Sequence, residues 1–309
     1  MRVLFSAHRK RFLEAMSGFA SDQAEGLRQL LGPQQLRVIA VASGKRGVGQ
    51  TNVVINLAQA LTAQGKSVLI LDEGVGAESC AGYLDLVPRC ELAQVLKQQV
   101  ALPQALLTYR STLQILPARA GLCRIGQLSG AAQQALRQSL TALPRQPDVL
   151  LIDLAAHRSP ITLAAIAAAD AVFIVVSPEH QAITQSYALI KHLAQALEQR
   201  RFYLIASKAK DPLQAAALCS NMQNAVARYL NMQLQDLGAV PWDEAVKHAN
   251  KRYQTTVEAF PDAAASRAYC ALAQVIAAWP MMRENSGHLE GFLQRLMMAS
   301  RTMELTARV

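Results

Sequence analysis

A glycine-rich turn at residues 44–52 carries the clearest chemistry in the chain. The residues before it, 38–42, are all apolar, and the apolar residues after it recur at the three- and four-residue spacing of a helix. Glycines let the backbone N–H groups of such a turn converge on one point, where the N-terminus of the following helix also favours an anion. The pattern predicts an anion-binding loop, formed by Gly44, Lys45, Gly47, Gly49, Gln50, Thr51 and Asn52.

One position of this turn departs from the phosphate-loop pattern. The sequence GxxxxGK[ST] would place a lysine where Gln50 stands. A glutamine side chain can donate a hydrogen bond, but it brings no positive charge to a phosphate. A strand, turn and helix that bind no ligand today therefore remain the alternative interpretation.

Two further apolar segments each end in an aspartate. Residues 67–71 lead to Asp72, and residues 149–152 lead to Asp153. Ligands of open α/β sheets bind at the carboxyl ends of the strands, and Asp153 is expected beside the loop for that reason.

Length and composition favour a large α/β domain. The chain has 309 residues, 51% of them hydrophobic and only 5% aromatic, with a formal net charge of +9. That charge permits contact with nucleic acid or an anionic membrane surface, but the basic residues are scattered. The five cysteines show no metal-type spacing, so we expect free thiols in a reducing cytoplasm. No apolar run reaches the length of a membrane span.

The turn, read as Lys45-Arg46-Gly47-Val48-Gly49-Gln50-Thr51, resembles the deviant phosphate loop of the MinD/ParA family, KGGxGK[ST]. In that family the early lysine reaches across a nucleotide-sandwiched homodimer to the partner's phosphates. The resemblance implies this role for Lys45, a Mg²⁺ ligand in Thr51, and a doubly wound α/β fold with a mostly parallel sheet of about seven or eight strands and helices on both faces. Two family residues are missing, a glycine at Arg46 and the second lysine at Gln50.

The resemblance continues through the acidic segments, with further losses. Residues 72–76 stand where the family has DADLG, so Asp72 survives as a catalytic remnant while the water-orienting aspartate is Gly74. Glu73 is adjacent, but its side chain is expected to point the other way because neighbours on a strand alternate. Asp153 corresponds to the acid behind Mg²⁺, and the glycines of the γ-phosphate loop that follows it are absent.

Adenine and partner contacts also have counterparts. Ser207 stands where the family has an adenine-reading asparagine, and Pro241 belongs to a segment that lies near the adenine in the family. Residues 187–191 resemble part of a helix that partners of MinD contact, which makes Tyr187 and Lys191 candidate partner residues.

The segment DQAEGLR at residues 22–28 resembles the N-terminal signature of the FlhG branch of this family, also called FleN or YlxH. In that branch the segment stimulates FlhF, an SRP-type GTPase. Asp22 and Glu25 also have the spacing of a helix-capping box. The residues expected to contact FlhF are Asp22, Gln23, Ala24, Leu27 and Arg28.

Four regions follow from these assignments. Residues 1–20 are a flexible extension, 21–33 the FlhF-activating helix, 34–280 the MinD-like domain, and 281–309 an amphipathic helix. The last helix carries apolar residues at helical spacing with few basic neighbours. Docking on the body and binding to a membrane surface are both open, and docking is favoured.

The resemblance thus implies an FlhG-like regulator of flagellar number and placement that acts through FlhF, with ATP hydrolysis lost and ATP and Mg²⁺ binding weakened or lost. Flagellar switch proteins or a transcriptional regulator are further partners implied by the resemblance. The expected location is the cytoplasm, with peripheral contact at the inner membrane or cell pole. A working ATPase that cycles between membrane-bound dimer and soluble monomer is the alternative; binding to nucleic acid is not expected.

Overall fold

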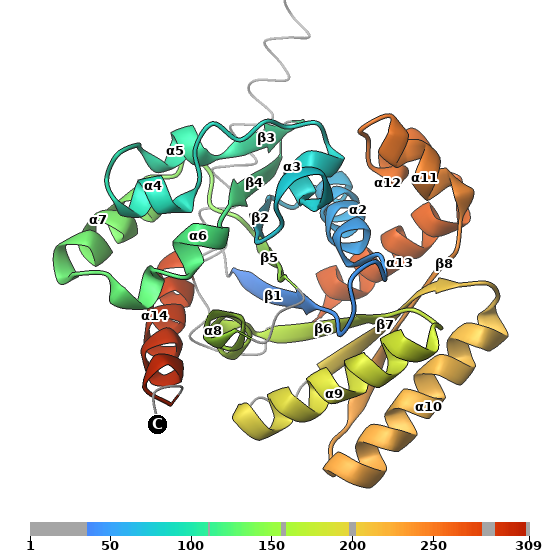
Figure 1. The fold of residues 1–309 in the computed structure, drawn as a ribbon. Coiled ribbons are helices and arrows are strands. Elements are labelled where there is room, and N and C mark those ends of the chain that lie inside the picture. The colour runs from blue at the N-terminus through green and yellow to red at the C-terminus, as the bar shows by residue number, and fades with distance from the viewer. Residues whose placement is uncertain (1–35, 111, 156–158, 198–201, 280–287, 307–309) are drawn as a thin grey trace, which may run out of the picture. The chain divides into compact units, whose positions relative to one another are not determined.

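The computed structural model describes residues 36–306, apart from residues 111, 156–158, 198–201 and 280–287. They form an eight-stranded sheet in the order β3-β4-β2-β5-β1-β6-β7-β8, with helices on both faces (Figure 1). Every neighbouring pair is parallel except β3 with β4, so the expected doubly wound, mostly parallel sheet is confirmed. The strands are β1 (Arg37–Ala42), β2 (Val68–Asp72), β3 (Leu107–Tyr109), β4 (Leu113–Pro117), β5 (Val149–Asp153), β6 (Ala171–Val176), β7 (Phe202–Ala209) and β8 (Leu234–Pro241).

The central strands are almost entirely apolar because helices cover both of their faces. Strand β1 lies between β5 and β6, and β5 pairs with β2 on its other side. The register sets Asp153 opposite Val41 on one side and opposite Asp72 on the other. Both acids therefore reach the sheet edge from which the loop after β1 leaves.

Two apolar cores lie on the two faces of the sheet. One is built with α2 and α13, and the other with α7, α8, α9, α10 and α14. The helical elements are α2 (Gln50–Ala63), η1 (Gly76–Glu78), α3 (Cys80–Tyr83), α4 (Leu92–Leu96), α5 (Leu102–Ala105), α6 (Arg119–Leu122), η2 (Ile125–Gln127), α7 (Gly130–Thr141), α8 (Pro160–Ala168), α9 (His180–Ala196), α10 (Pro212–Leu230), α11 (Glu244–Lys251), α12 (Thr256–Ala259), α13 (Ala264–Ala278) and α14 (Leu289–Thr306).

A buried asparagine ties α2 to a segment 200 residues later. The Asn56 side-chain oxygen accepts the N–H groups of Thr256 and Val257 at 2.6 and 3.1 Å, which caps the start of α12. Its amide nitrogen donates to the Asn52 carbonyl at 2.8 Å. Because both ends of the amide are bonded, its complete burial leaves no unpaired polar atom.

The C-terminal helix α14 is docked on the body. Its apolar stripe is buried, and α14 packs mainly against α8. Arg295 adds a hydrogen bond from Nε to the Ala168 carbonyl at 3.0 Å. The buried residues of the stripe are Leu289, Phe292, Leu293, Leu296 and Met297. In the described part of the chain, no helix is both long enough and apolar enough to cross a membrane.

Residues 92–107 and 125–143 each have a sequence pattern that predicts one continuous helix, but the structure divides both. Residues 92–107 form α4, α5 and the start of β3, because Gln98 turns the chain with a φ of 58° and Pro103 begins a new helix. Residues 125–143 divide at Ser129, whose side chain caps α7 by accepting the Ala132 N–H. The expected extension 1–20 and the expected FlhF-activating helix 21–33 both lie outside the described residues.

Candidate functional site

The loop between β1 and α2 has the backbone of an anion-binding turn. Gly47 and Gly49 have φ values of 80° and 95°, which glycine adopts without strain. A Cβ at Gly49 would lie 3.0 Å from the Ser207 hydroxyl, and one at Gly44 would lie 2.3 Å from the backbone of Gln185 in α9. The loop therefore needs glycine for conformation at two positions and for close packing at two.

This loop borders a cavity of about 340 Å³. The opposite wall comes from the ends of β2 and β5 and from the start of α6. The cavity-lining residues are Ser43, Arg46, Gly47, Gly49, Gln50, Thr51, Asn52, Glu73, Gly74, Val75, Glu78, Tyr83, Arg119, Asp153, Leu154 and Ala155. The structure thus brings the loop residues predicted from the sequence, from Gly47 to Asn52, together with Asp153.

Gln50 is committed to contacts within the protein. Its Nε2 lies 2.6 Å from both the Asp153 carboxylate and the Leu154 carbonyl, and 3.2 Å from the Val41 carbonyl. The side chain links α2 to the ends of β1 and β5. It supplies no positive charge to the cavity.

Thr51 and Asp153 offer oxygen ligands of the kind that Mg²⁺ prefers. The Thr51 hydroxyl donates to Asp153 Oδ2 at 2.9 Å, and Asp153 is buried. Hydroxyl and carboxylate oxygens are hard ligands, which Mg²⁺ prefers, so these residues fit that ion.

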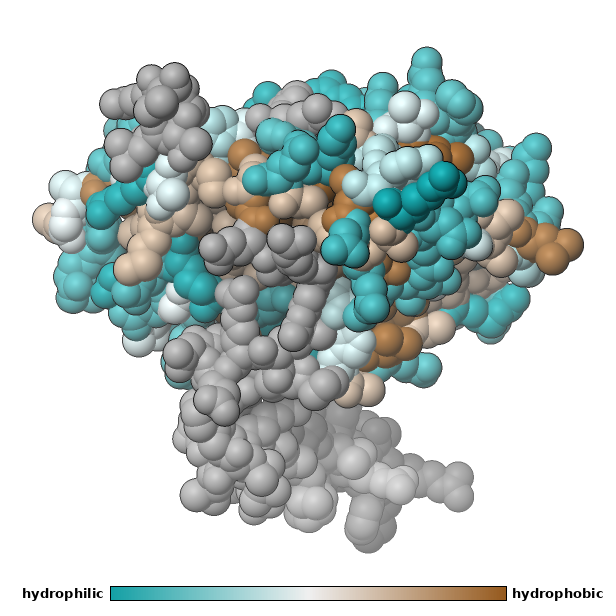
Figure 2. Space-filling view, turned by 90° about the horizontal axis from the view of Figure 1, so that it is seen from below, coloured by the Kyte–Doolittle hydropathy of each residue, from teal (hydrophilic) through white to brown (hydrophobic). Residues whose placement is uncertain are grey.

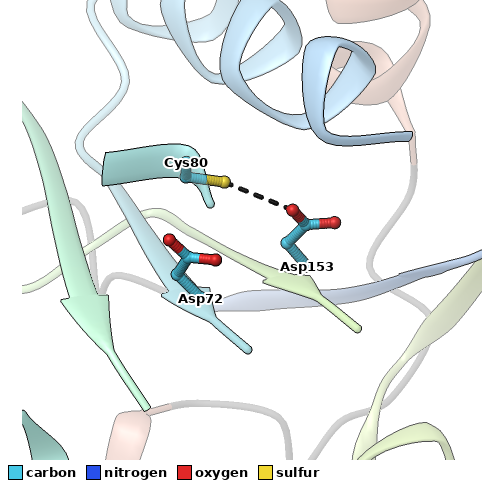
Figure 3. Close-up of side chains that lie close together, drawn as sticks. All are labelled: Asp72, Cys80 and Asp153. Carbon is cyan, nitrogen blue, oxygen red and sulfur yellow. Dashed lines mark hydrogen bonds between the residues drawn. The ribbon is translucent and has the colours of Figure 1, made fainter. Parts of the chain in front are cut away.

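Asp72, Cys80 and Asp153 form a buried cluster beside the cavity (Figure 3). One potential ligand atom from each lies within 4.8 Å of the others, and Cys80 donates to Asp153 Oδ2 at 3.4 Å. Burial, and then the charge of Asp153, raise the pKa of Asp72 to about 7, although the N–H groups of Gly74 and Ala81 favour the carboxylate. Burial also raises the pKa of Asp153. Both carboxyl groups are therefore harder to ionise than a carboxyl group in water.

Glu73 is the cavity residue that the sequence interpretation placed wrongly. Its side chain faces the cavity, only 4% of the residue is exposed, and Oε2 accepts the Ala155 N–H at 2.8 Å. Strand β2 ends at Asp72, so the alternation that should have turned Glu73 away no longer applies. Burial raises the pKa of Glu73, and the Ala155 N–H opposes that shift.

Gly74 leaves no room for the missing aspartate. A Cβ there would lie 2.6 Å from the Ser79 Cα and 2.8 Å from Asp72 Oδ1. Ser79 follows η1 and caps α3 by accepting the Gly82 N–H. The turn packs tightly against Gly74. This position therefore lacks both the aspartate of the family and the space that an aspartate side chain would need.

Two lysine side chains connect the loop to neighbouring elements. Lys45 forms an ion pair with Glu179, which precedes α9. Lys208, at the end of β7, donates to the Gly47 carbonyl at 2.6 Å. Its backbone is in the left-handed region, with a φ of 61°, where a register shift interrupts the pairing of β7 with β8. Nothing in the sequence pattern pointed to Lys208.

The remaining sequence candidates lie apart from the cavity. Ser207 lies beside Gly49, and Pro241 pairs with Ala209 at the same sheet edge. On α9, Tyr187 is half-buried against the core and Lys191 is exposed. Asp22, Gln23, Ala24, Leu27 and Arg28 fall outside the described residues.

Comparison with known proteins agrees with this architecture. Residues 36–204 match the family model of an AAA domain. The antiactivator FleN of Pseudomonas aeruginosa is 35% identical over 87% of this chain and 96% of its own length. The flagellum site-determining protein YlxH of Helicobacter pylori is 27% identical over 66% of this chain and 69% of its own length.

Solved structures show the same fold. The septum site-determining protein MinD of Pyrococcus horikoshii, complexed with Mg-ADP, aligns with a TM-score of 0.60 at 20% identity over 79% of this chain and 96% of that chain. A chain of the MinC:MinD cell division protein complex of Aquifex aeolicus aligns with a TM-score of 0.61 at 23% identity, over 80% of this chain and 98% of that chain.

Proposed function

This chain belongs to the FlhG (FleN/YlxH) branch of the MinD/ParA family, and we propose that it regulates the number and placement of flagella. The observation that carries the proposal is the 35% identity to the antiactivator FleN over 96% of that protein's length. A shared fold alone would be compatible with many roles, because the same fold serves several functions. The likeness to FleN is more specific than the fold.

The partner in this proposal is the GTPase FlhF, contacted through residues 22–28. The support is the sequence DQAEGLR itself, in which Asp22 and Glu25 have the spacing of a helix-capping box. The short amphipathic helix that the sequence predicts there would be marginal alone in water and would gain stability once a partner covers its apolar face. Tyr187 and Lys191 on α9 offer a second contact, because they lie about one turn apart on a helix that reaches the surface.

GTP hydrolysis by FlhF tests this partner directly. A peptide of residues 21–31 and the full-length protein should each accelerate GTP hydrolysis by purified FlhF. The matched control is the same peptide with Leu27 and Arg28 replaced by alanine, which keeps its length and helix propensity. If neither the peptide nor the full-length protein stimulates FlhF, this part of the proposal fails.

We further propose that the cavity binds nucleotide with Mg²⁺ but does not hydrolyse it efficiently. The loop backbone and the Thr51–Asp153 pair favour binding of the phosphates and the ion. When bound, Mg²⁺ would neutralise charge on the phosphates. Against hydrolysis, Gln50 brings no charge and Gly74 brings no carboxylate, so neither residue can stabilise the transition state or orient water.

Other partners and the location are extensions of the same proposal. A nucleotide-sandwiched homodimer would require Lys45 to leave its ion pair with Glu179, which is feasible because both side chains are partly exposed. Flagellar switch proteins or a transcriptional regulator are the further partners that the FlhG resemblance suggests. Membrane contact through α14 would be weak, because its apolar stripe is already buried.

A further inference from the structure

We propose that this cavity selects a nucleoside diphosphate over the triphosphate, because the Glu73 carboxylate occupies the place of a terminal phosphate. The inference rests on the proposal that the cavity binds nucleotide. It concerns the cavity wall opposite the loop, where the buried Glu73 carboxylate already accepts the Ala155 N–H group.

The loop wall offers free donors to phosphate. Within the described chain, none of the backbone N–H groups of residues 47–51 donates to another protein group. These groups stand at the N-terminus of α2, a helix of 14 residues, whose dipole also favours negative charge. The part of a nucleotide nearest the loop therefore meets donors that no protein acceptor competes for.

On the opposite wall, the backbone N–H group nearest to Glu73 is already bonded. The Ala155 N–H, in the segment that follows β5, donates to Glu73 Oε2 at 2.8 Å. A phosphate oxygen that approached this N–H would have to displace a carboxylate oxygen. It would also meet that carboxylate as a like charge in a largely buried site, where such a pair is costly.

Glu73 is held firmly in this position. Its own backbone N–H donates to the Asp153 carbonyl at 3.1 Å, so both ends of the residue are bonded to β5 or its continuation. Moving the side chain away would leave a buried carboxylate without its donor. We therefore expect Glu73 to keep its position when a nucleotide binds. A nucleoside diphosphate, which is one phosphate shorter than the triphosphate, can bind without contacting this carboxylate.

The lysine that would bring positive charge to the phosphates is missing from this cavity. Gln50 stands where a lysine would bring positive charge, and its amide is bonded to Asp153 and Leu154. Arg119 lines the cavity, but its charge already acts on Glu73, whose pKa it lowers. Arg46 also lines the cavity, from the loop side, so the two arginines and the Glu73 carboxylate together set the charge that a third phosphate would meet.

Calorimetric titration of the full-length protein with Mg-ADP and Mg-ATP tests the inference. The wild type should bind ADP at least about tenfold more tightly than ATP. Glu73→Gln keeps the side-chain volume and the acceptor for Ala155 while removing the charge. It should tighten ATP binding by about tenfold and change ADP binding by less than about twofold.

Glu78→Gln is the matched control, because Glu78 lines the same cavity but is exposed and lies on η1. It removes the same charge and should leave the ADP-to-ATP ratio unchanged. The inference is overturned if the wild type binds ATP as tightly as ADP, if both glutamine variants shift the ratio equally, or if neither nucleotide binds. If Glu73→Gln does not fold, the wild-type ratio still decides. FlhF stimulation is measured separately, so failure here is distinct from failure of the proposed regulatory role.

Discussion

The two walls of the cavity are built from different parts of the chain. The loop wall is made of backbone, and its geometry depends on glycines at positions 47 and 49. The opposite wall is made of side chains at the ends of β2 and β5, and there Glu73 and Gly74 replace the family's pattern. A backbone site tolerates the loss of neighbouring side chains, whereas a site made of side chains loses its chemistry with each one. Binding and hydrolysis can therefore be lost independently in this molecule.

The largest expected effect concerns hydrolysis at the side-chain wall. The wild type should release no detectable phosphate from ATP, because each missing electrostatic contact costs on the order of 10²–10³ in rate. A steady-state phosphate-release assay, run beside an intact MinD-type ATPase, measures this. Gln50→Lys alone should stay near background, since Gly74 still offers no carboxylate.

A reversion at Gly74 is a poor test by itself. The Cβ of an aspartate there would lie 2.6 Å from the Ser79 Cα, so Gly74→Asp must move the turn before it can restore chemistry. Turnover by the wild type comparable to that of the intact enzyme, and abolished by Lys45→Ala, would contradict the separation of the two walls.

The next effect concerns the loop wall. Gly49→Ala should weaken ADP binding at least tenfold and destabilise the protein by about 1–3 kcal/mol, because alanine is strained at a φ of 95°. Gly130→Ala is the control, since a Cβ at Gly130 meets nothing within 4 Å. Calorimetry and thermal unfolding measure the two effects. Equal ADP affinity in both variants would show that the loop backbone is not what holds the ligand.

A smaller effect, on stability, is expected from the pair of carboxyl groups of Asp72 and Asp153. The pKa of Asp72 is raised to about 7 in the folded protein, so its ionisation costs stability progressively between about pH 4 and pH 7 and no further above that. Asp72→Asn should therefore be more stable than the wild type at pH 8, by about 1 kcal/mol or roughly 2–4 °C.

The advantage of Asp72→Asn should shrink as the pH falls toward 5, because the folded wild type then keeps the proton on Asp72. Thermal unfolding at both pH values, without added Mg²⁺, provides the comparison. An asparagine variant that loses stability equally at both pH values would mean that the backbone bonds to Gly74 and Ala81 outweigh the repulsion.

The smallest expected effect is on membrane binding through α14. Full-length protein should co-sediment with anionic liposomes weakly, and less at higher salt, because each basic residue near the surface contributes only about 1 kcal/mol. Met298→Glu should change this little if the docked state dominates, since Met298 is 60% exposed on the face turned from the core. Strong nucleotide-dependent sedimentation would argue for release of the helix.

The sequence was sufficient for the features that depend on neighbouring residues. The continuous apolar runs of β1, β2 and β5 and the glycines of the loop are local patterns, and each appears in the structure where it was expected. Asp153 followed from its place at the end of an apolar run. These features are set by periodicity and backbone conformation, which are visible in a single sequence.

Features that depend on distant segments could not be predicted in this way. The contact of Lys208 with Gly47 joins residues 161 positions apart. The left-handed backbone of Lys208 could not be predicted either, because the residue at this position is not a glycine. The direction of the Glu73 side chain was predicted wrongly because it depends on the residue at which β2 ends. Strand ends are poorly defined by sequence. The divided helices at residues 98 and 129 have the same origin, since local turns interrupted otherwise helical patterns.

The Asn56 link described above has a consequence for how the chain folds during synthesis. The helix that follows the glycine-rich loop is tied through Asn56 to the N–H groups of Thr256 and Val257, and β1 pairs with both β5 and β6. The earliest part of the described domain to leave the ribosome is therefore among the last to reach its final partners. Such long-range closure slows folding and prolongs exposure of apolar strands, so newly made chains of this protein should depend on chaperones.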